Sequence, residues 1–250
     1  MVTQQQLADF ARDGFLVLRG MYDADEVAQM QAWVERLAHT PPAFGKEMAY
    51  YEDSLSEPGR RILCRIEKFA DPDMPFAAIT GARKMLDVTD ALQGGPSVLF
   101  KEKINFKLPG GGGFEPHQDI QPGWDDYAPY FLSVCIAIDA NTVENGCLEL
   151  AAGHHKRGWL GERMKPLTPA QLAGVEFVAC PMQPGDVAFF DCYAPHQSAP
   201  NRTDSPRRNV YLTYNRAADG DHRERYFADK RANFPPDNER EAGKEYRYRV

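Results

Sequence analysis

The residues best suited to chemistry are a histidine and an aspartate two positions apart, His117 and Asp119, and a second histidine further along, His196. On an extended chain, side chains at alternate positions point to the same side, so His117 and Asp119 can reach one ion. Two imidazoles and one carboxylate form the ligand face of non-haem Fe(II) oxygenases, which leaves positions open for oxygen and a cosubstrate. We therefore predict a metal site made of His117, Asp119 and His196.

The segments around these residues indicate how the chain delivers them. A glycine-rich run, 109–113, comes just before His117 and gives the backbone freedom there. The turn signal Pro184-Gly185-Asp186 leads into an apolar run, 187–190, which is suited to a buried strand and ends shortly before His196. Strands are expected at about 98–108, 131–139, 147–151, 175–180, 186–191 and 208–215.

The part of the chain before residue 98 is expected to be mainly helical. It contains a helix from the capping box at Thr3 to Gly14, a strand at 15–18, a helix from Asp23 to about Leu37, an irregular segment at 40–58 and a helix at 79–92. Helices followed by many strands that look antiparallel indicate a mainly β fold with flanking helices. The fold class we predict is a double-stranded β-helix, a jelly roll of the cupin type.

We expect a single domain over residues 1–250, with the jelly-roll core at about 98–215 and a charged C-terminal extension at 217–250. The extension also carries aromatic residues: Tyr226, Phe227, Phe234, Tyr246 and Tyr248. It is either a solvated tail or a segment that packs across the barrel or a second subunit through these rings.

Composition narrows the class of partner and the compartment. A net charge of −7 argues against nucleic acid or an anionic membrane as the main partner. No apolar run is long enough to span a membrane, and the N-terminus lacks the pattern of a secretory signal. The five cysteines are odd in number and lack a C-x-x-C pair, so we expect buried thiols in a reducing cytoplasm. A small-molecule substrate is expected, and a homodimer is left open.

A set of motifs in this order resembles the phytanoyl-CoA dioxygenase family over roughly residues 5–215. The motifs are Gln6-Leu7 through Arg19-Gly20, His117-Gln118-Asp119, Glu144-Asn145-Gly146-Cys147-Leu148, Pro184-Gly185-Asp186, His196 and Arg207. One departure is Cys147, where a proline is common in that family. The resemblance implies an Fe(II)- and 2-oxoglutarate-dependent oxygenase that hydroxylates its substrate and releases succinate and CO2. Fe(II), 2-oxoglutarate and O2 would be required, with ascorbate as a reductant in vitro.

The resemblance also implies roles for individual residues. His117, Asp119 and His196 would bind iron, and Arg207 would pair with the distal carboxylate of 2-oxoglutarate through two parallel hydrogen bonds. Arg208 is the rival, since only one of two adjacent strand residues can point inward. Asn105 resembles the family position that contacts the cosubstrate. Ser133, on the next strand, either contacts it as well or is an ordinary strand serine. Because halogenating relatives replace the metal-binding carboxylate, Asp119 argues against halogenation.

The charge pattern of the strand that contains Asn105 indicates which kind of substrate the site could bind. Lys101, Lys103, Asn105 and Lys107 fall on one face, and apolar residues at 104, 106 and 108 fall on the other. Either the lysines face solvent, or this cationic face lines the mouth of the barrel and favours an anionic substrate. If Asn105 contacts the cosubstrate, the second arrangement follows, with Lys103 and Lys107 as candidate substrate-binding residues.

Trp124 is a further candidate substrate residue, because it lies in the segment just after the metal motif. It either closes over the substrate or fills a gap in the core. Within the family, the run from Lys101 to His117 and the segments 219–223 and 226–231 look similar to a bacterial group that includes 2-aminoethylphosphonate dioxygenases. A small anionic metabolite such as a phosphonate or an amino acid would suit this group.

Two other functions use the same residues. A jelly roll with this triad can serve as a non-catalytic sensor of metal or 2-oxoglutarate, and the same ligands can hold zinc or manganese. The joint presence of Asp119 and Arg207 favours the oxygenase, because a binding module does not need both.

Overall fold

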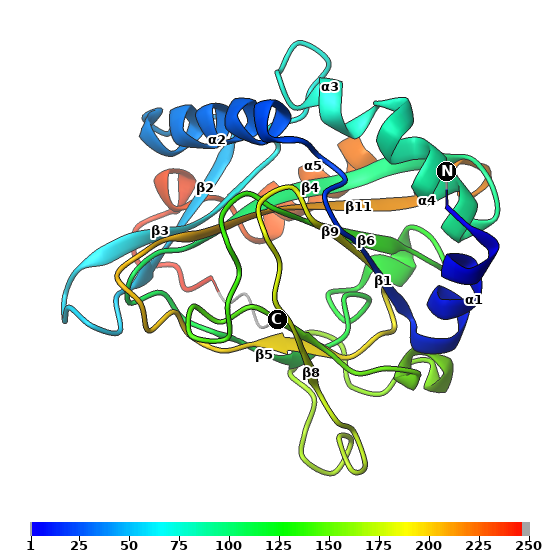
Figure 1. The fold of residues 1–250 in the computed structure, drawn as a ribbon. Helices are drawn as coiled ribbons and strands as arrows, with labels where there is room; N and C mark the ends of the chain where they lie inside the picture. Colours follow the sequence, from blue (N-terminus) through cyan, green and yellow to red (C-terminus); the bar gives the residue numbers. More distant parts are fainter. Residues whose placement is uncertain (1, 247–250) are drawn as a thin grey trace.

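Two antiparallel β-sheets of unequal size form the body of the computed structural model, which describes residues 2–246 (Figure 1). The larger sheet has the order β1-β9-β6-β11-β4-β3-β2 and the smaller sheet has the order β5-β10-β7-β8. The strands of the larger sheet are β1 (Phe15–Leu18), β2 (Met48–Asp53), β3 (Arg61–Glu67), β4 (Ser97–Lys107), β6 (Leu132–Ala137), β9 (Val187–Asp191) and β11 (Arg207–Arg216). Those of the smaller sheet are β5 (Phe114–His117), β7 (Leu148–Leu150), β8 (Val178–Cys180) and β10 (His196–Ser198).

The two sheets pack face to face around a small apolar core. Cys135 and Phe190 of the larger sheet lie in one buried cluster with Leu148, Leu150 and Cys180 of the smaller sheet. The predicted jelly roll is confirmed, and none of the five cysteines forms a disulfide. Three strands that precede residue 97 extend the larger sheet beyond the predicted core range.

Helices from the part of the chain before β4 cover the outer face of the larger sheet (Figure 1). The α-helices are α1 (Gln4–Asp13), α2 (Ala24–His39), α3 (Ala77–Thr80), α4 (Arg83–Gln93) and α5 (Arg223–Asn233). Short 3-10 helices lie at Trp124–Asp126, His154–Arg157, Ala217–Asp219 and Asp237–Glu239. Met30 of α2 and Met85 of α4 are fully buried against the same core as Ile104 and Phe106 of β4. No helix in the described residues is long and apolar enough to cross a membrane.

The N-terminal helices begin where their capping residues predict. Thr3 and Asp23 each accept from backbone N–H groups of the first turn and form capping boxes, and Gly14 ends α1 in the left-handed conformation. The single helix predicted at 79–92 is wrong in one respect. The segment forms two helices, because Gly81 caps the end of α3 and Ala82 is extended before α4 begins.

The segment predicted to be irregular at 40–58 contains strand β2, which pairs with β3 to extend the larger sheet. Its first three residues, 48–50, are buried, so the strand is held by packing as well as by its ladder. In contrast, the strand predicted at 175–180 is shorter and covers only β8. Residues of the hairpin formed by β2 and β3 line a cavity of about 520 Å³.

Part of the C-terminal extension packs against the barrel, while other described residues of it, such as 241–245, are exposed. Helix α5 lies against β4, and its Tyr226 and Phe227 are buried in a cluster that includes Phe100 and Trp124. Beyond the helix, Phe234 stacks on the ring of Tyr50, at 5.5 Å between ring centroids. Of the two roles left open for these aromatic residues, packing holds for Tyr226, Phe227 and Phe234. Tyr246 lines a cavity, and Tyr248 lies outside the described residues.

Candidate metal and cosubstrate site

Two neighbouring strands of the smaller sheet bring the two histidines together. His117 ends β5 and His196 begins β10, and the two residues are direct partners in the antiparallel ladder. Their rings lie 4.2 Å apart between centroids. The glycine-rich run permits this approach, because a Cβ on Gly113 would meet the backbone oxygen of Ser198 at 2.6 Å.

Asp119 completes a compact group of three potential metal ligands. Its Oδ1 atom lies 3.9 Å from Nε2 of His117 and 3.7 Å from Nε2 of His196. The Nδ1 atom of each ring faces a backbone carbonyl, that of Glu115 at 2.7 Å and that of Ala194 at 3.0 Å. This hydrogen bond fixes the proton on Nδ1, so both Nε2 lone pairs face the carboxylate. The donor set fits Fe(II), and the predicted triad is assembled as one buried group.

The charges of the three groups suit metal binding at neutral pH. Burial lowers the pKa of His117 to about 3 and also lowers the pKa of His196. Burial opposes ionisation of Asp119, but His196 and Lys103 outweigh it and hold the pKa of this carboxyl below its usual value. Neutral imidazoles beside an ionised carboxylate are the protonation states that a metal ion requires.

Ser133 of β6 supports the carboxylate of this group. Its hydroxyl donates a hydrogen bond to Oδ2 of Asp119, which leaves Oδ1 facing the two histidines. Such partners of a metal ligand fix its orientation. Because this hydroxyl is engaged with Asp119, contact between Ser133 and a cosubstrate stays a prediction.

Arg207, and not Arg208, points into the barrel. Arg207 is fully buried, and its Nη1 atom donates to Oδ1 of Asn141 at 3.2 Å. Arg208 points to the other side, where it pairs with Asp139 and Glu35. The choice between adjacent arginines that the sequence left open is therefore settled by the orientation of the strand.

The guanidinium of Arg207 has two donors that no described residue uses. Its Nε and Nη2 atoms are buried, and neither has a hydrogen-bond partner among residues 2–246. These two N–H groups are parallel, which is the geometry that accepts both oxygens of a carboxylate. Leaving such donors unsatisfied is costly, so the site fits the carboxylate of a 2-oxo acid.

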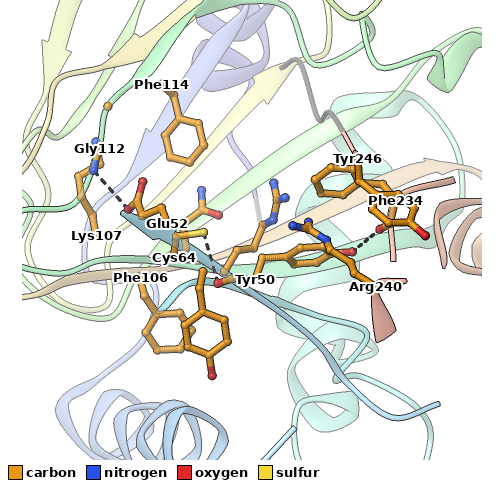
Figure 2. A pocket seen from close by; sticks show the side chains of 14 residues that line it. Tyr50, Glu52, Cys64, Phe106, Lys107, Gly112, Phe114, Phe234, Arg240 and Tyr246 are labelled. Atoms are coloured by element: carbon orange, nitrogen blue, oxygen red, sulfur yellow. Dashed lines mark hydrogen bonds between the residues drawn. The ribbon is translucent and has the colours of Figure 1, made fainter. Parts of the chain in front are cut away.

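Asn105 links the metal group to a larger cavity of about 520 Å³. Asn105 and Phe114 line both the metal pocket and this cavity, and Oδ1 of Asn105 has no partner among the described residues. Figure 2 shows the cavity between Gly112 and Phe114 on one side and the C-terminal Phe234 on the other. The full lining is Tyr50, Tyr51, Glu52, Cys64, Arg65, Asn105, Phe106, Lys107, Gly112, Gly113, Phe114, Phe234, Arg240 and Tyr246.

The predicted cationic face of β4 points inward, so the arrangement with its lysines in solvent is excluded. Lys101 and Lys107 are almost fully buried, and Lys103 lines the metal pocket. Lys107 donates to Ser198 Oγ at 2.8 Å and to the carbonyls of Gly146 and Ala199. These bonds use all three donors of its ammonium group, which leaves none for a substrate. Lys103 remains the candidate.

Of the two roles predicted for Trp124, closing over the substrate or filling the core, the structure shows the second. Trp124 is 2% exposed and packs edge-on against Phe100 and Phe131. The ammonium of Lys101 lies 4.6 Å from the centroid of its ring. Trp124 also lines a second hollow beside α5, so it forms a wall and does not close over the metal pocket.

The sequence interpretation missed three charged residues near this site: Arg65, Glu67 and Lys230. The first two belong to β3, which was not predicted, because polar and apolar residues alternate only over the short stretch 64–67. Lys230 lies on α5, in the extension, and its ammonium lies 2.7 Å from the carboxylate of Glu67. Only the fold brings it to the barrel.

Comparison with known proteins agrees with this geometry. The family description phytanoyl-CoA dioxygenase (PhyH) matches residues 10–209. The chain is 37% identical to the 2-aminoethylphosphonate dioxygenase of the uncultured bacterium HF130_AEPn_1, over 98% of this chain and 93% of that protein. It is 38% identical to the methylphosphonate hydroxylase of Gimesia maris, over 93% of this chain and 88% of that protein.

A solved structure shares the fold. The crystal structure of EctD from S. alaskensis with 2-oxoglutarate and 5-hydroxyectoine has a TM-score of 0.75 and 28% identity, and covers 87% of this chain and 77% of that one. The jelly roll and its buried site therefore define an Fe(II)- and 2-oxoglutarate-dependent dioxygenase. Within that class, the chain belongs to the phytanoyl-CoA dioxygenase family.

Proposed function

We propose that this dioxygenase hydroxylates a small metabolite that carries a phosphonate group. His117, Asp119 and His196 hold the iron, and Arg207 binds the distal carboxylate of 2-oxoglutarate through its two unused donors. Asn105 contacts the cosubstrate from β4. The bound iron supplies the activation of O2, which is coupled to decarboxylation of 2-oxoglutarate to succinate and CO2.

The observation that carries the substrate class is the position of Lys103. This lysine lines the metal pocket, and its Nζ atom has no hydrogen bond or ion pair within residues 2–246. Its Nζ atom also lies 5.1 Å from the centroid of the Tyr211 ring. A cation beside the metal without a partner favours an anionic substrate in a chain that is acidic overall. The two phosphonate-oxidising relatives support the choice of anion.

The surrounding residues position the substrate and keep water out. Phe114 and Leu148 line the metal pocket beside the ligands, so the reacting carbon would lie in an apolar setting with the anion held at Lys103. A net charge of −7 and five free cysteines support a small-molecule substrate rather than nucleic acid, and a cytoplasmic location. A homodimer stays a prediction.

Succinate formation tests this proposal. Protein purified without oxygen would receive Fe(II), ascorbate, 2-oxoglutarate and air, together with 2-aminoethylphosphonate, methylphosphonate or ectoine. We expect a phosphonate to stimulate succinate release and to be hydroxylated, and Asp119→Ala to abolish both. Stimulation by ectoine and by neither phosphonate would contradict the proposed substrate class.

A further inference from the structure

Two buried amides, Asn141 and Asn209, hold one nitrogen of the Arg207 guanidinium. Asn141 follows β6 and is 1% exposed, and Asn209 lies on β11, where it is fully buried. Oδ1 of Asn141 accepts a hydrogen bond from Nη1 of Arg207 at 3.2 Å. In the amide orientation that satisfies its neighbours, Asn209 also accepts from Nη1, at 2.8 Å, and donates to the carbonyl of Arg208 at 2.8 Å. Both amides therefore contact the same atom of the guanidinium.

The two amides leave the other donors of Arg207 open. Nη1 meets the amides, whereas Nε and Nη2 are buried and have no hydrogen-bond partner among residues 2–246. Nε and Nη2 form the edge of the guanidinium that can meet both oxygens of a carboxylate. Because a guanidinium is planar and rigid, holding it at Nη1 also fixes the direction of this edge.

Neutral partners also leave the charge of Arg207 uncompensated. The partners that the described residues give this guanidinium are amides, with no carboxylate among them. Arg208, its neighbour, differs in this respect, because it pairs with Asp139 and Glu35. A buried cation that the protein does not neutralise is costly, so it favours an anionic ligand. The amides thus orient Arg207 without competing with that ligand.

The motif Glu144-Asn145-Gly146 builds the turn that holds Asn141. The side chain of Asn145 accepts from the N–H group of Thr142 and donates to the carbonyl of Ala140, each at 2.8 Å. These two bonds bracket Asn141 on both sides. The backbone of Asn141 also pairs with that of Met182 in an isolated bridge. A motif that the metal site does not use therefore fixes the position of an arginine partner.

Strand β11 connects this arrangement to the metal pocket. Arg207, Asn209 and Tyr211 are alternate residues of the strand, so they share one face of it. Tyr211 lines the metal pocket together with His117 and Asp119. A ligand that extends from the metal pocket along this face therefore approaches the open edge of Arg207.

We propose that Asn141 and Asn209 are positioning residues for the cosubstrate. They hold Arg207 at Nη1, so that its Nε and Nη2 donors take the distal carboxylate of 2-oxoglutarate. This inference rests on the proposed function, which assigns that carboxylate to Arg207. It adds a requirement that both amides be neutral, because an acidic side chain at either position would itself pair with Arg207 and weaken the selection of dicarboxylates.

Titration without oxygen tests the two amides, because turnover cannot occur. Protein loaded with Fe(II) would be titrated with 2-oxoglutarate and with 2-oxopentanoate, which has the same chain length but lacks the distal carboxylate. We expect the wild type to bind 2-oxoglutarate about a hundredfold more tightly. Asn141→Ala should reduce this preference to about tenfold, and Asn141→Asp should reduce it further, with little change in the binding of 2-oxopentanoate. Asn233→Ala, which removes an exposed amide of α5, is the matched control.

The aspartate variant separates positioning from structural support. Asp at position 141 keeps an acceptor for Nη1 of Arg207, so a purely structural role predicts an unchanged preference. We expect a loss, because the new carboxylate neutralises the guanidinium. If Asn141→Ala and Asn141→Asp both retain the preference, the inference is wrong, although Arg207 can still bind the cosubstrate. Equal weakening of the two 2-oxo acids would assign the amides a structural role and would also overturn the inference.

Further outcomes keep the inference and the proposed function apart. Should the variants of Asn141 fail to fold, Asn209→Asp makes the same test from β11 without a change in size, and the same loss of preference is expected. Equal binding of both 2-oxo acids by the wild type would overturn the role of Arg207 and this inference with it. Because the titration contains no phosphonate, failure of phosphonates to stimulate succinate release would overturn only the proposed substrate.

Discussion

The two sheets of the barrel contribute to the site in different ways. The smaller sheet supplies His117 and His196 from strands of four and three residues, and Asp119 follows directly. The larger sheet supplies charged and polar side chains from β4 and β11, which are eleven and ten residues long. The metal group is compact and local. In contrast, the cationic wall, which consists of Lys101, Lys103 and Lys107 of β4 and Arg207 of β11, is spread along two long strands.

The residues that would hold the metal are therefore separate from those proposed to recognise the substrate and cosubstrate. Three ligands within 4.8 Å of one another define where O2 can be activated, and few substitutions there can be tolerated. On the opposite wall, the proposed anion contacts are Arg207 at one place and Lys103 at another, so each can change independently of the metal. We expect relatives with the same triad to differ in substrate through residues of the larger sheet.

Removal of the shared carboxylate should have the largest effect. Asp119→Ala takes away the group that both histidines face, so iron content and succinate formation should fall by about a hundredfold or more. Metal analysis of the purified protein and a succinate assay check this result. Asp126→Ala removes an exposed carboxylate that pairs with Arg163 and should leave both unchanged. Retained iron with full activity in Asp119→Ala would contradict the metal site.

The adjacent arginines offer a matched pair on the larger sheet. Arg207→Met should weaken the binding of 2-oxoglutarate by about a hundredfold, because a buried charge pair is lost, and should leave iron binding intact. Arg208→Met removes the partner of Asp139 and Glu35 on the outer side and should leave the affinity for 2-oxoglutarate unchanged. Equal effects of the two substitutions on this affinity would show that the cosubstrate does not lie at Arg207.

A charge reversal at Lys103 tests the substrate wall. Lys103→Glu places a negative charge in the metal pocket and should raise the Michaelis constant for the phosphonate by about tenfold, with little change in the constant for the cosubstrate. Steady-state kinetics with each compound varied in turn measure the two constants. Lys156→Glu, at an exposed position, serves as the control. An unchanged Michaelis constant for the phosphonate would exclude Lys103 as the anion contact.

The smallest effect on catalysis is expected from the packing of the extension. Phe227 of α5 is 1% exposed, and Phe227→Ala should lower the free energy of unfolding by about 3 kcal/mol through the lost burial and the cavity left behind. Phe44→Ala, at a side chain that is 83% exposed, should change it little. Thermal or denaturant unfolding distinguishes them. A negligible effect of Phe227→Ala would mean that α5 is not part of the packed barrel.

The ligands of the smaller sheet could be predicted from the sequence more readily than the inward-facing residues of the larger sheet. His117 and Asp119 are neighbours in the chain, and the order of motifs that ends at His196 and Arg207 identified the triad and the family. The choice between Arg207 and Arg208 was out of reach, because it depends on which face of β11 meets the smaller sheet.

The cationic wall was only partly predictable for the same reason. Alternation in β4 showed that its lysines share a face but not whether that face is buried. Glu67 and Lys230 are far apart in the chain, and their ion pair exists only because α5 folds back over the strand that carries Glu67. Long-range charge pairs of this kind leave no periodic signal in a sequence, unlike amphipathic helices and strands.

The most direct test of the central claim follows the two atoms of O2. The enzyme with Fe(II) and 2-oxoglutarate would oxidise 2-aminoethylphosphonate under isotopically heavy O2, with mass spectrometry of both products. We predict equal amounts of succinate and hydroxylated phosphonate, with one labelled oxygen atom in each. Labelled succinate without a labelled phosphonate product would contradict a phosphonate hydroxylase. Absence of succinate despite bound iron and 2-oxoglutarate would contradict the oxygenase itself.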